Sequence, residues 1–244
     1  MKNFMIDKDW VKENYHGEAD FTIPEGATEI GEKAFAFCKS LESIEIPESV
    51  TKIGEFAFML CGSLRSIKVP DSVTEIGKGA FVGCAYLESI HIPNSIVEIK
   101  KAAFEDCESL TSVHIPDSVT KIEKEAFAYC TSLESIEISD NVTEIGDWAF
   151  DGCHSLKSIH IPEGVTEIRD SAFAKCESLK SIRIPDSVTK IERWAFWGCK
   201  SLESIYIPDS VTEINESAFG WCDSLKSIRL PDSVTEKARY LNAE

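Results

Sequence analysis

Hydrophobic and polar positions along this chain recur with a period of 23 residues. The most regular part of the pattern is Ala-Phe-x-x-Cys, where x is a variable position. It occurs nine times without an insertion, and its phenylalanines are Phe35, Phe58, Phe81, Phe104, Phe127, Phe150, Phe173, Phe196 and Phe219. Self-similarity at a period of roughly 20–50 residues predicts a solenoid or another repeat architecture.

Residues 47–69 illustrate one unit of the repeat. A Pro-Glu-Ser turn leads into a short extended segment at residues 50–53. Residues 54–64 then place apolar side chains at helical spacing on one face. The unit closes at residues 66–69, where apolar and polar side chains alternate as in a strand with one buried face.

A single unit has one apolar side and too little volume to bury it, so successive units must stack. The pattern therefore predicts a solenoid of about nine to ten coils, in which the strands of adjacent coils pair in parallel. Neighbouring strands stack at about 4.8 Å, so each phase of the repeat forms a column along the body.

The two ends of the chain depart from the repeat. Residues 1–20 predict an N-terminal cap, in which Asp7 begins a short helix that ends near Gly17. The solenoid is expected over 21–235, and residues 236–244 form a C-terminal cap or tail. If this tail caps poorly, the last coil offers a surface for end-to-end dimerisation, so both a monomer and such a dimer are expected states.

All nine cysteines sit three residues after a repeat phenylalanine. An odd number at one fixed phase, without any Cys-x-x-Cys, argues against a disulfide framework and against a tetrahedral zinc site. We expect buried, reduced thiols that pack as small hydrophobic groups. Disulfides between neighbouring coils remain conceivable, because the coil spacing falls within the separation that a disulfide spans.

The charge of the chain excludes several kinds of partner. Net charge is −17, which repels phosphate backbones and anionic lipid, so neither nucleic acid nor membrane insertion is expected. No apolar run approaches the ~20 residues of a membrane span. Residues 1–10 meet a charge before an export signal could form, so a cytoplasmic location stays open.

The full unit reads Ile-Pro-Asp-Ser-Val-Thr-x-Ile-x-x-x-Ala-Phe-x-x-Cys-x-Ser-Leu-x-Ser-Ile-x-Ile. It resembles the bacterial surface-antigen (BspA-like) class of leucine-rich repeats over residues 21 to about 235. This resemblance implies a curved α/β leucine-rich-repeat solenoid, with a parallel β-sheet on the concave face and short helical turns on the convex side, and no catalytic residues. It also implies a cell-surface or secreted protein that binds host proteins or other cells.

One outward strand position varies from coil to coil and is the main candidate for binding a protein partner. Repeat proteins bind partners across such extended concave surfaces. The candidate residues are Lys68, His91, His114, Glu137, His160, Arg183, Tyr206 and Arg229. Within this column, His91, His114, Glu137 and His160 are also a weak candidate for a divalent metal site, although strand ladders hold side chains parallel and solvated histidines are the simpler interpretation.

Tryptophans near the Ala-Phe pairs form an alternative candidate surface: Trp148, Trp194, Trp197 and Trp221. Partly exposed tryptophan clusters are typical of binding hot spots and of platforms on which glycans stack. A structural interpretation is that these rings lie flat over the seams between coils.

Motifs for a catalytic triad, a phosphate-binding loop or general acid–base catalysis are not found in the sequence. We therefore expect a non-enzymatic, adhesin-like interaction module without a cofactor. The alternatives are a glycan-binding module that uses the tryptophans, and a structural spacer of a larger protein.

Overall fold

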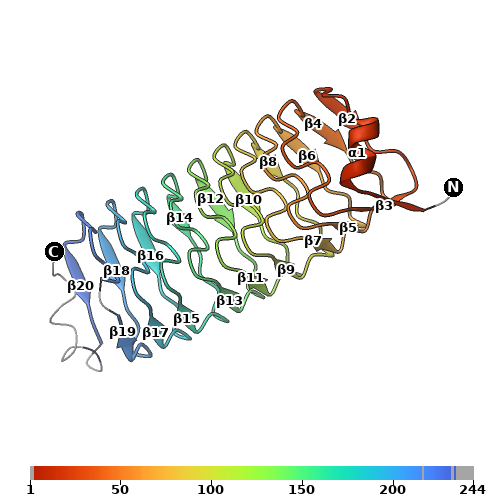
Figure 1. Cartoon of the computed structure of the whole chain (residues 1–244). Coiled ribbons are helices and arrows are strands. Elements are labelled where there is room, and N and C mark those ends of the chain that lie inside the picture. The colour runs from red at the N-terminus through yellow and green to blue at the C-terminus, as the bar shows by residue number, and fades with distance from the viewer. Residues whose placement is uncertain (1–2, 216, 232–233, 235–244) are drawn as a thin grey trace.

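A computed structural model describes residues 3–215, 217–231 and 234 of the chain. The coils stack into one elongated body, with the first and last strands at opposite ends (Figure 1). The predicted 23-residue parallel-strand solenoid is confirmed. The predicted tail at 236–244, and dimerisation through it, lie outside the described residues.

The Ser-Ile-x segments form a line of parallel strands along one side of the body, which we call the strand face. Serine pairs with serine and isoleucine with isoleucine, each 23 residues further on. The strands are β2 (Asp20–Thr22), β4 (Ser43–Glu45), β6 (Ser66–Lys68), β8 (Ser89–Ile90), β10 (Ser112–His114), β12 (Ser135–Glu137), β14 (Ser158–Ile159), β16 (Ser181–Arg183), β18 (Ser204–Tyr206) and β20 (Ser227–Arg229). The isoleucine or valine of each repeat strand points into the core because side chains alternate between the two faces of a sheet.

A second line of parallel strands comes from the segments predicted only as extended. They are β1 (Phe4–Ile6), β3 (Ala27–Ile30), β5 (Lys52–Ile53), β7 (Glu75–Ile76), β9 (Glu98–Ile99), β11 (Lys121–Ile122), β13 (Glu144–Ile145), β15 (Glu167–Ile168), β17 (Lys190–Ile191) and β19 (Glu213–Ile214). Both lines divide into three hydrogen-bonded sheets at the same coils, after β7 and β8 and again after β13 and β14.

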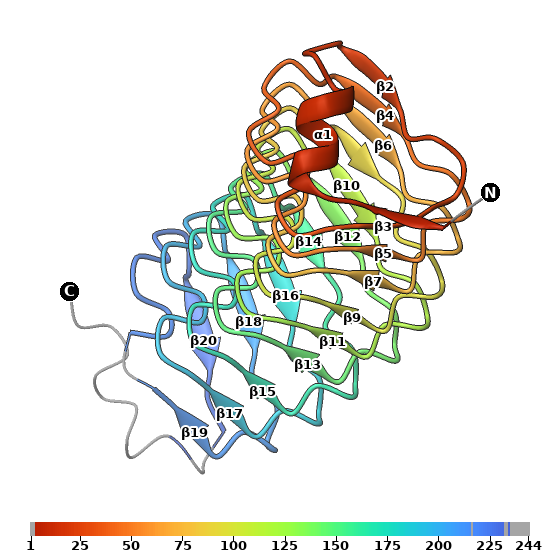
Figure 2. The same ribbon diagram turned by 45° about the vertical axis from the view of Figure 1, so that its right-hand side comes forward.

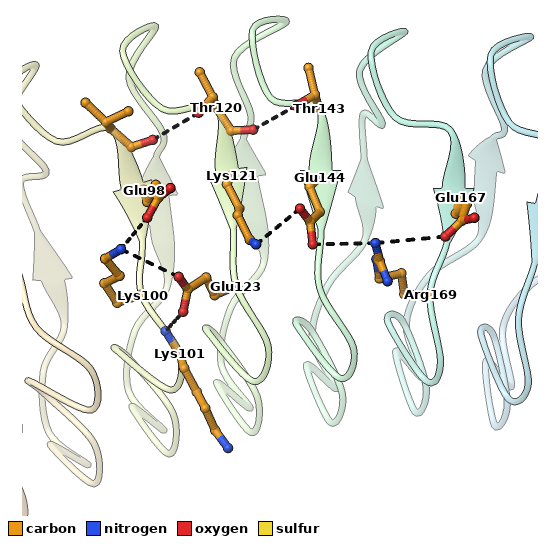
Figure 3. A network of polar contacts seen from close by, with 11 residues as sticks. Glu98, Lys100, Lys101, Thr120, Lys121, Glu123, Thr143, Glu144, Glu167 and Arg169 are labelled. Atoms are coloured by element: carbon orange, nitrogen blue, oxygen red, sulfur yellow. Dashed lines mark hydrogen bonds and ion pairs between the residues drawn. The ribbon is translucent and has the colours of Figure 1, made fainter.

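Acidic and basic side chains form ion pairs along the outer surface of this second line (Figure 3). Lys121 Nζ lies 3.2 Å from Glu144 Oε2, and Arg169 Nη2 lies 3.5 Å from Glu144 Oε1. These pairs are partly exposed, so each adds less than about 1 kcal/mol to stability. Their main effect is to neutralise neighbouring coils that would otherwise repel each other.

The third side of each coil, the turn side, contains residues such as 54–64. Here a residue alternately bonds within its own coil and to the next coil: Ala57 N–H donates to Gly54 O at 3.3 Å, and Phe58 N–H donates to Ala80 O at 2.8 Å. The predicted helical turns are thus single turns joined by a ladder between coils. This ladder holds two residues per coil at positive φ, among them Trp148, Trp194 and Trp221.

The core is a set of columns, because each core residue packs against the equivalent residue of the neighbouring coil. The nine repeat phenylalanines stack with ring centroids 5.3–5.6 Å apart and rings within 13° of parallel. Beside them the cysteines are free thiols, and each from Cys61 onward donates from Sγ to a phenylalanine carbonyl of the preceding coil. The thiols therefore pack as reduced hydrophobic groups, as expected from their fixed phase.

The N-terminal helix α1 (Lys8–Asn14) lies across the end of the first coils (Figure 2). Asp7 caps it by accepting a hydrogen bond from Trp10 N–H at 2.8 Å. The Tyr15 ring lies 6.3 Å from the first ring of the phenylalanine column, Phe35. Strand β1, which the sequence analysis did not predict, pairs with β3. The segment thus covers the end of the stack, whereas the domain boundaries at 20 and 235 stay predictions.

Candidate functional site

The variable strand column is exposed on every coil that the structure describes, so its side chains face solvent as predicted. It comprises Glu45, Lys68, His91, His114, Glu137, His160, Arg183, Tyr206 and Arg229. The uniform strand position beside it is buried, because strand side chains alternate. The strand face therefore carries a row of exposed side chains that differ from coil to coil, on a backbone that repeats.

The three histidines of this column pair with carboxylates rather than with each other. His91 Nε2 lies 3.4 Å from Asp71 Oδ1, and His160 Nε2 lies 3.1 Å from Asp140 Oδ1. Only His114 contacts a neighbour in the column, Glu137, at 3.1 Å. Among the described residues, no group of three or more metal-binding side chains lies together, and the four candidates do not converge on one point.

The C-terminal half of the strand face carries larger side chains. Tyr206 is 49% exposed, and the Arg229 guanidinium lies 5.9 Å from the centroid of its ring. Arg183 Nη2 lies 3.1 Å from Glu163 Oε1. An exposed tyrosine flanked by arginines has the composition that is enriched at protein interfaces.

The turn side contains a hollow of about 480 Å³, which we call the aromatic hollow. Its lining brings together three of the four predicted tryptophans with five residues that the sequence analysis did not single out as site residues. The lining is Tyr129, Trp148, Asp151, Ser171, Ala174, Lys175, Trp194 and Trp197. The fourth tryptophan, Trp221, is 63% exposed and lies outside it, with its ring 6.0 Å from that of Trp197.

The hollow follows from the size of the residues in neighbouring columns. Trp148 and Trp194 occupy the same turn position two coils apart, with the small Ser171 between them. Two coil spacings separate their backbones by about 10 Å. A small residue between two large ones leaves a gap where a third ring would otherwise pack.

Asp151 is the buried charged group of this hollow, with 5% of the residue exposed. Its Oδ1 has no hydrogen-bond partner, and the nearest cation, Lys175 Nζ, lies 3.7 Å away. Burial raises the pKa of the Asp151 carboxyl, an effect that the Lys175 charge partly opposes. The Asp151 charge in turn raises the pKa of Tyr129.

Basic side chains hold the aromatic rings. Lys124 Nζ lies 4.1 Å from the Trp148 ring centroid, and the Arg193 guanidinium lies 4.2 Å from that of Trp194. Arg193 is itself held by Asp170, whose Oδ2 accepts a hydrogen bond from Nη2 at 3.0 Å. The two rings are therefore positioned before any ligand arrives.

Other large side chains on the turn side agree with the structural interpretation of this surface. A Cβ atom on Gly79 would lie 2.4 Å from the Phe56 ring, and one on Gly152 would lie 2.6 Å from the Tyr129 ring. These rings lie over a glycine of the following coil. The sequence therefore indicates where a ring covers the contact between two coils: a large residue is followed 23 positions later by glycine. Trp148 and Trp194 are not followed by glycine in this way.

Comparison with known proteins identifies the family of the repeat. The family model described as BspA type leucine rich repeat region matches residues 14–134 and 120–242. No curated protein sequence matches significantly. In the described part of the chain, no helix is long and apolar enough to cross a membrane.

Three solved structures illustrate the likeness. A leucine-rich-repeat protein of T. pallidum is 26% identical with a TM-score of 0.53, over 93% of this chain and 84% of that one. Pneumococcal vaccine antigen PcpA is 22% identical with a TM-score of 0.56, over 89% and 73%. A leucine-rich cell surface protein of Faecalibacterium prausnitzii is 27% identical with a TM-score of 0.40, over 93% and 91%. With the family model matching most of its length, the chain belongs to the BspA-type leucine-rich-repeat family.

Proposed function

We propose that this chain is a non-enzymatic module that binds a protein partner through the strand face. Leucine-rich-repeat solenoids are typically non-enzymatic scaffolds that mediate protein interactions. The observation that carries the proposal is the contrast between two strand positions: the isoleucine or valine position is buried from Ile44 to Ile205, whereas the variable position next to it is exposed on every described coil. Discrimination between partners needs side chains that differ from coil to coil, and this column supplies them.

The centre of the proposed interface is the segment from Arg183 to Arg229. Tyrosine and arginine are the residues that contribute most to binding when buried at an interface, whereas charged pairs at the rim contribute little. The exposed Tyr206 ring, with Arg229 beside it, is therefore the anchor of the proposal. The histidine–carboxylate pairs on the central coils would form a polar rim.

Capture of a partner by the immobilised chain tests this proposal. The double substitution Arg183→Ala with Tyr206→Ala should reduce capture at least about tenfold, since it removes two anchor side chains. Both side chains are exposed, so the thermal midpoint should change little. Full capture by a folded double variant would exclude this part of the strand face.

The family commonly comprises surface proteins, and we propose a cell-surface or secreted location on that basis. Glycan binding is a second candidate function, which one observation favours: three tryptophans line a single hollow. A spacer role within a larger protein is the remaining alternative, and partner capture that depends on the strand face would argue against it.

A further inference from the structure

We infer that the aromatic hollow binds one ring of a neutral sugar, with Trp148 and Trp194 as the stacking surfaces and Asp151 as the hydrogen-bond acceptor. This inference rests on the second candidate function and is independent of the strand face. It adds the polar groups that recognise the ligand and the chemical class of that ligand.

The polar part of the site is Asp151. A buried carboxylate oxygen without a hydrogen-bond partner is costly, and such groups in native structures call for an explanation. The Oδ1 atom itself is covered, but the Asp151 side chain lines the hollow and is 8% exposed, so a ligand hydroxyl can donate to the exposed part of the carboxylate. Lys175 Nζ, 3.7 Å from Oδ1, can donate to a second ligand oxygen.

The apolar part of the site is the pair of indole rings. Their backbones lie two coils apart, about 10 Å, and van der Waals contact takes about 3.5–4.0 Å on each side of a ligand. This backbone separation therefore suits one ligand ring between the two indoles rather than two. Trp194 is 39% exposed, so its ring is available to a ligand. Tryptophan combines a large apolar face with a polar edge, which suits a ligand with apolar and hydroxylated surfaces.

The surrounding charges select a neutral ligand. Lys124, Lys175 and Arg193 already lie against the aromatic rings, so an organic cation would meet three positive charges. An anion would meet the buried Asp151 and the neighbouring Asp170. A polyhydroxylated ring avoids both repulsions and has hydroxyl groups that can donate to the exposed part of the Asp151 carboxylate.

The site is also held ready for binding. Ser171 donates from its hydroxyl to Asp170 Oδ1 at 2.8 Å, and Asp170 fixes Arg193 over the Trp194 ring. Because these contacts exist without a ligand, little side-chain freedom is lost on binding. Loss of Trp194 should therefore weaken binding more than loss of a mobile surface aromatic.

Titration of the intact chain with free sugars tests the inference. The probes are glucose, galactose, mannose and N-acetylglucosamine, each added to about 50 mM, with tryptophan fluorescence and calorimetry as readouts. At least one sugar should bind saturably, and tetramethylammonium should not. Absence of saturable binding by all four sugars, or binding of tetramethylammonium in their place, would overturn the inference.

The chain itself supplies substitutions that its fold accepts. Alanine occupies the Asp151 position in both adjacent coils, and serine occupies the Trp194 position in both of its neighbours. Asp151→Ala and Trp194→Ser should each weaken sugar binding at least about tenfold. The matched controls Asp223→Ala and Trp221→Ala, outside the hollow, should retain it within about twofold.

The strand-face double variant separates this inference from the first proposal. Arg183→Ala with Tyr206→Ala should bind sugar as the native chain does. If Asp151→Ala and Trp194→Ser retain full sugar affinity, the hollow is not the site, whatever the outcome of partner capture.

Discussion

At the residue scale, burial of the Asp151 carboxylate has a cost that Lys175 offsets only in part. The same repeat position is alanine in both adjacent coils, whereas here a carboxylate lies buried and its Oδ1 has no hydrogen-bond partner. Residues that lower the stability of the fold are found mainly at functional sites. The stability of variants at this position therefore reports on the site independently of any ligand.

Asp151→Ala should raise the free energy of unfolding by about 1–2 kcal/mol at neutral pH, because it removes a buried, unsatisfied carboxylate. Chemical denaturation of the two chains measures the difference. Asp223→Ala, which changes an exposed carboxylate, should stay within about 0.5 kcal/mol of the native chain. A clearly destabilised Asp151→Ala chain would mean that the carboxylate has a stabilising partner.

The gain in stability expected for Asp151→Ala should also depend on pH. Burial raises the pKa of this carboxyl above its value of about 3.9 in the unfolded chain. The cost is therefore fully present above the folded-state pKa, where the group is ionised, and is lost as pH falls through that pKa toward 4. Thermal midpoints of the native and variant chains should converge on acidification; a constant difference would exclude ionisation as its cause.

The cysteines give a second prediction at this scale. Burial raises the pKa of the Cys84 thiol to about 12 and that of Cys222 to about 11, so almost no reactive thiolate exists at neutral pH. A thiol reagent should label the folded chain slowly, with Cys38 and Cys222 first because they are only partly buried. All nine should react after denaturation; rapid labelling of the central coils would contradict the packed core.

At the scale of elements, glycines set how closely two coils approach. A Cβ atom on Gly77 would lie 2.6 Å from Glu55 N in the preceding coil, whereas one on Gly62 meets no atom within 4 Å. Later coils carry longer side chains at the Gly77 phase, including Lys100. Both lines of strands are interrupted between the coils of Gly77 and Lys100, where the residue at this position changes from glycine to lysine.

Gly77→Ala should therefore destabilise the chain by about 1–3 kcal/mol through overpacking against backbone that cannot move aside alone. Gly62→Ala is the matched control and should change stability by less than about 0.5 kcal/mol. Denaturant midpoints of the two variants provide the comparison. Equal midpoints would show that the coil of Gly77 can move away from the preceding coil without loss of stability.

The phenylalanine column is the element that joins all coils. Phe127 is fully buried, with neighbouring rings at 5.3 and 5.6 Å, so Phe127→Ala should cost about 3–5 kcal/mol and divide the stack into two weakly coupled halves. Phe37→Ala removes the same ring from a site that is 55% exposed and should cost far less. Denaturation followed by circular dichroism measures the stability of both variants. A similar loss of stability in the two would contradict the role of the phenylalanine column in joining the coils.

At the scale of the whole molecule, periodicity alone predicted the fold and the core columns, because a repeat with one apolar side has to stack. The turn geometry was not predictable from residue preferences: Trp148 and Trp194 adopt positive φ, which bulky residues rarely do without a supporting ladder. Asp151 was missed because its phase holds residues from alanine to tryptophan, so nothing local marks it as buried.

The candidate strand column was predicted in full as an exposed row, because alternation in a strand fixes which side chains face outward. Its pairing was not predictable, since His91 and His160 contact acidic turn residues 20 positions earlier rather than their column neighbours. Binding itself stays a prediction that the fold supports only through exposure and composition.

Parallel capture by three immobilised chains, namely the native chain, Arg183→Ala with Tyr206→Ala, and Trp194→Ser, is the most direct test that the strand face is the protein-binding surface. Cross-linked partners are identified after exposure to extracellular protein, and each variant is first shown to be folded. We expect the native chain and Trp194→Ser to retain the same partner and the double variant to lose it, as the strand-face proposal requires. Equal retention by all three chains, or loss from Trp194→Ser alone, would contradict it.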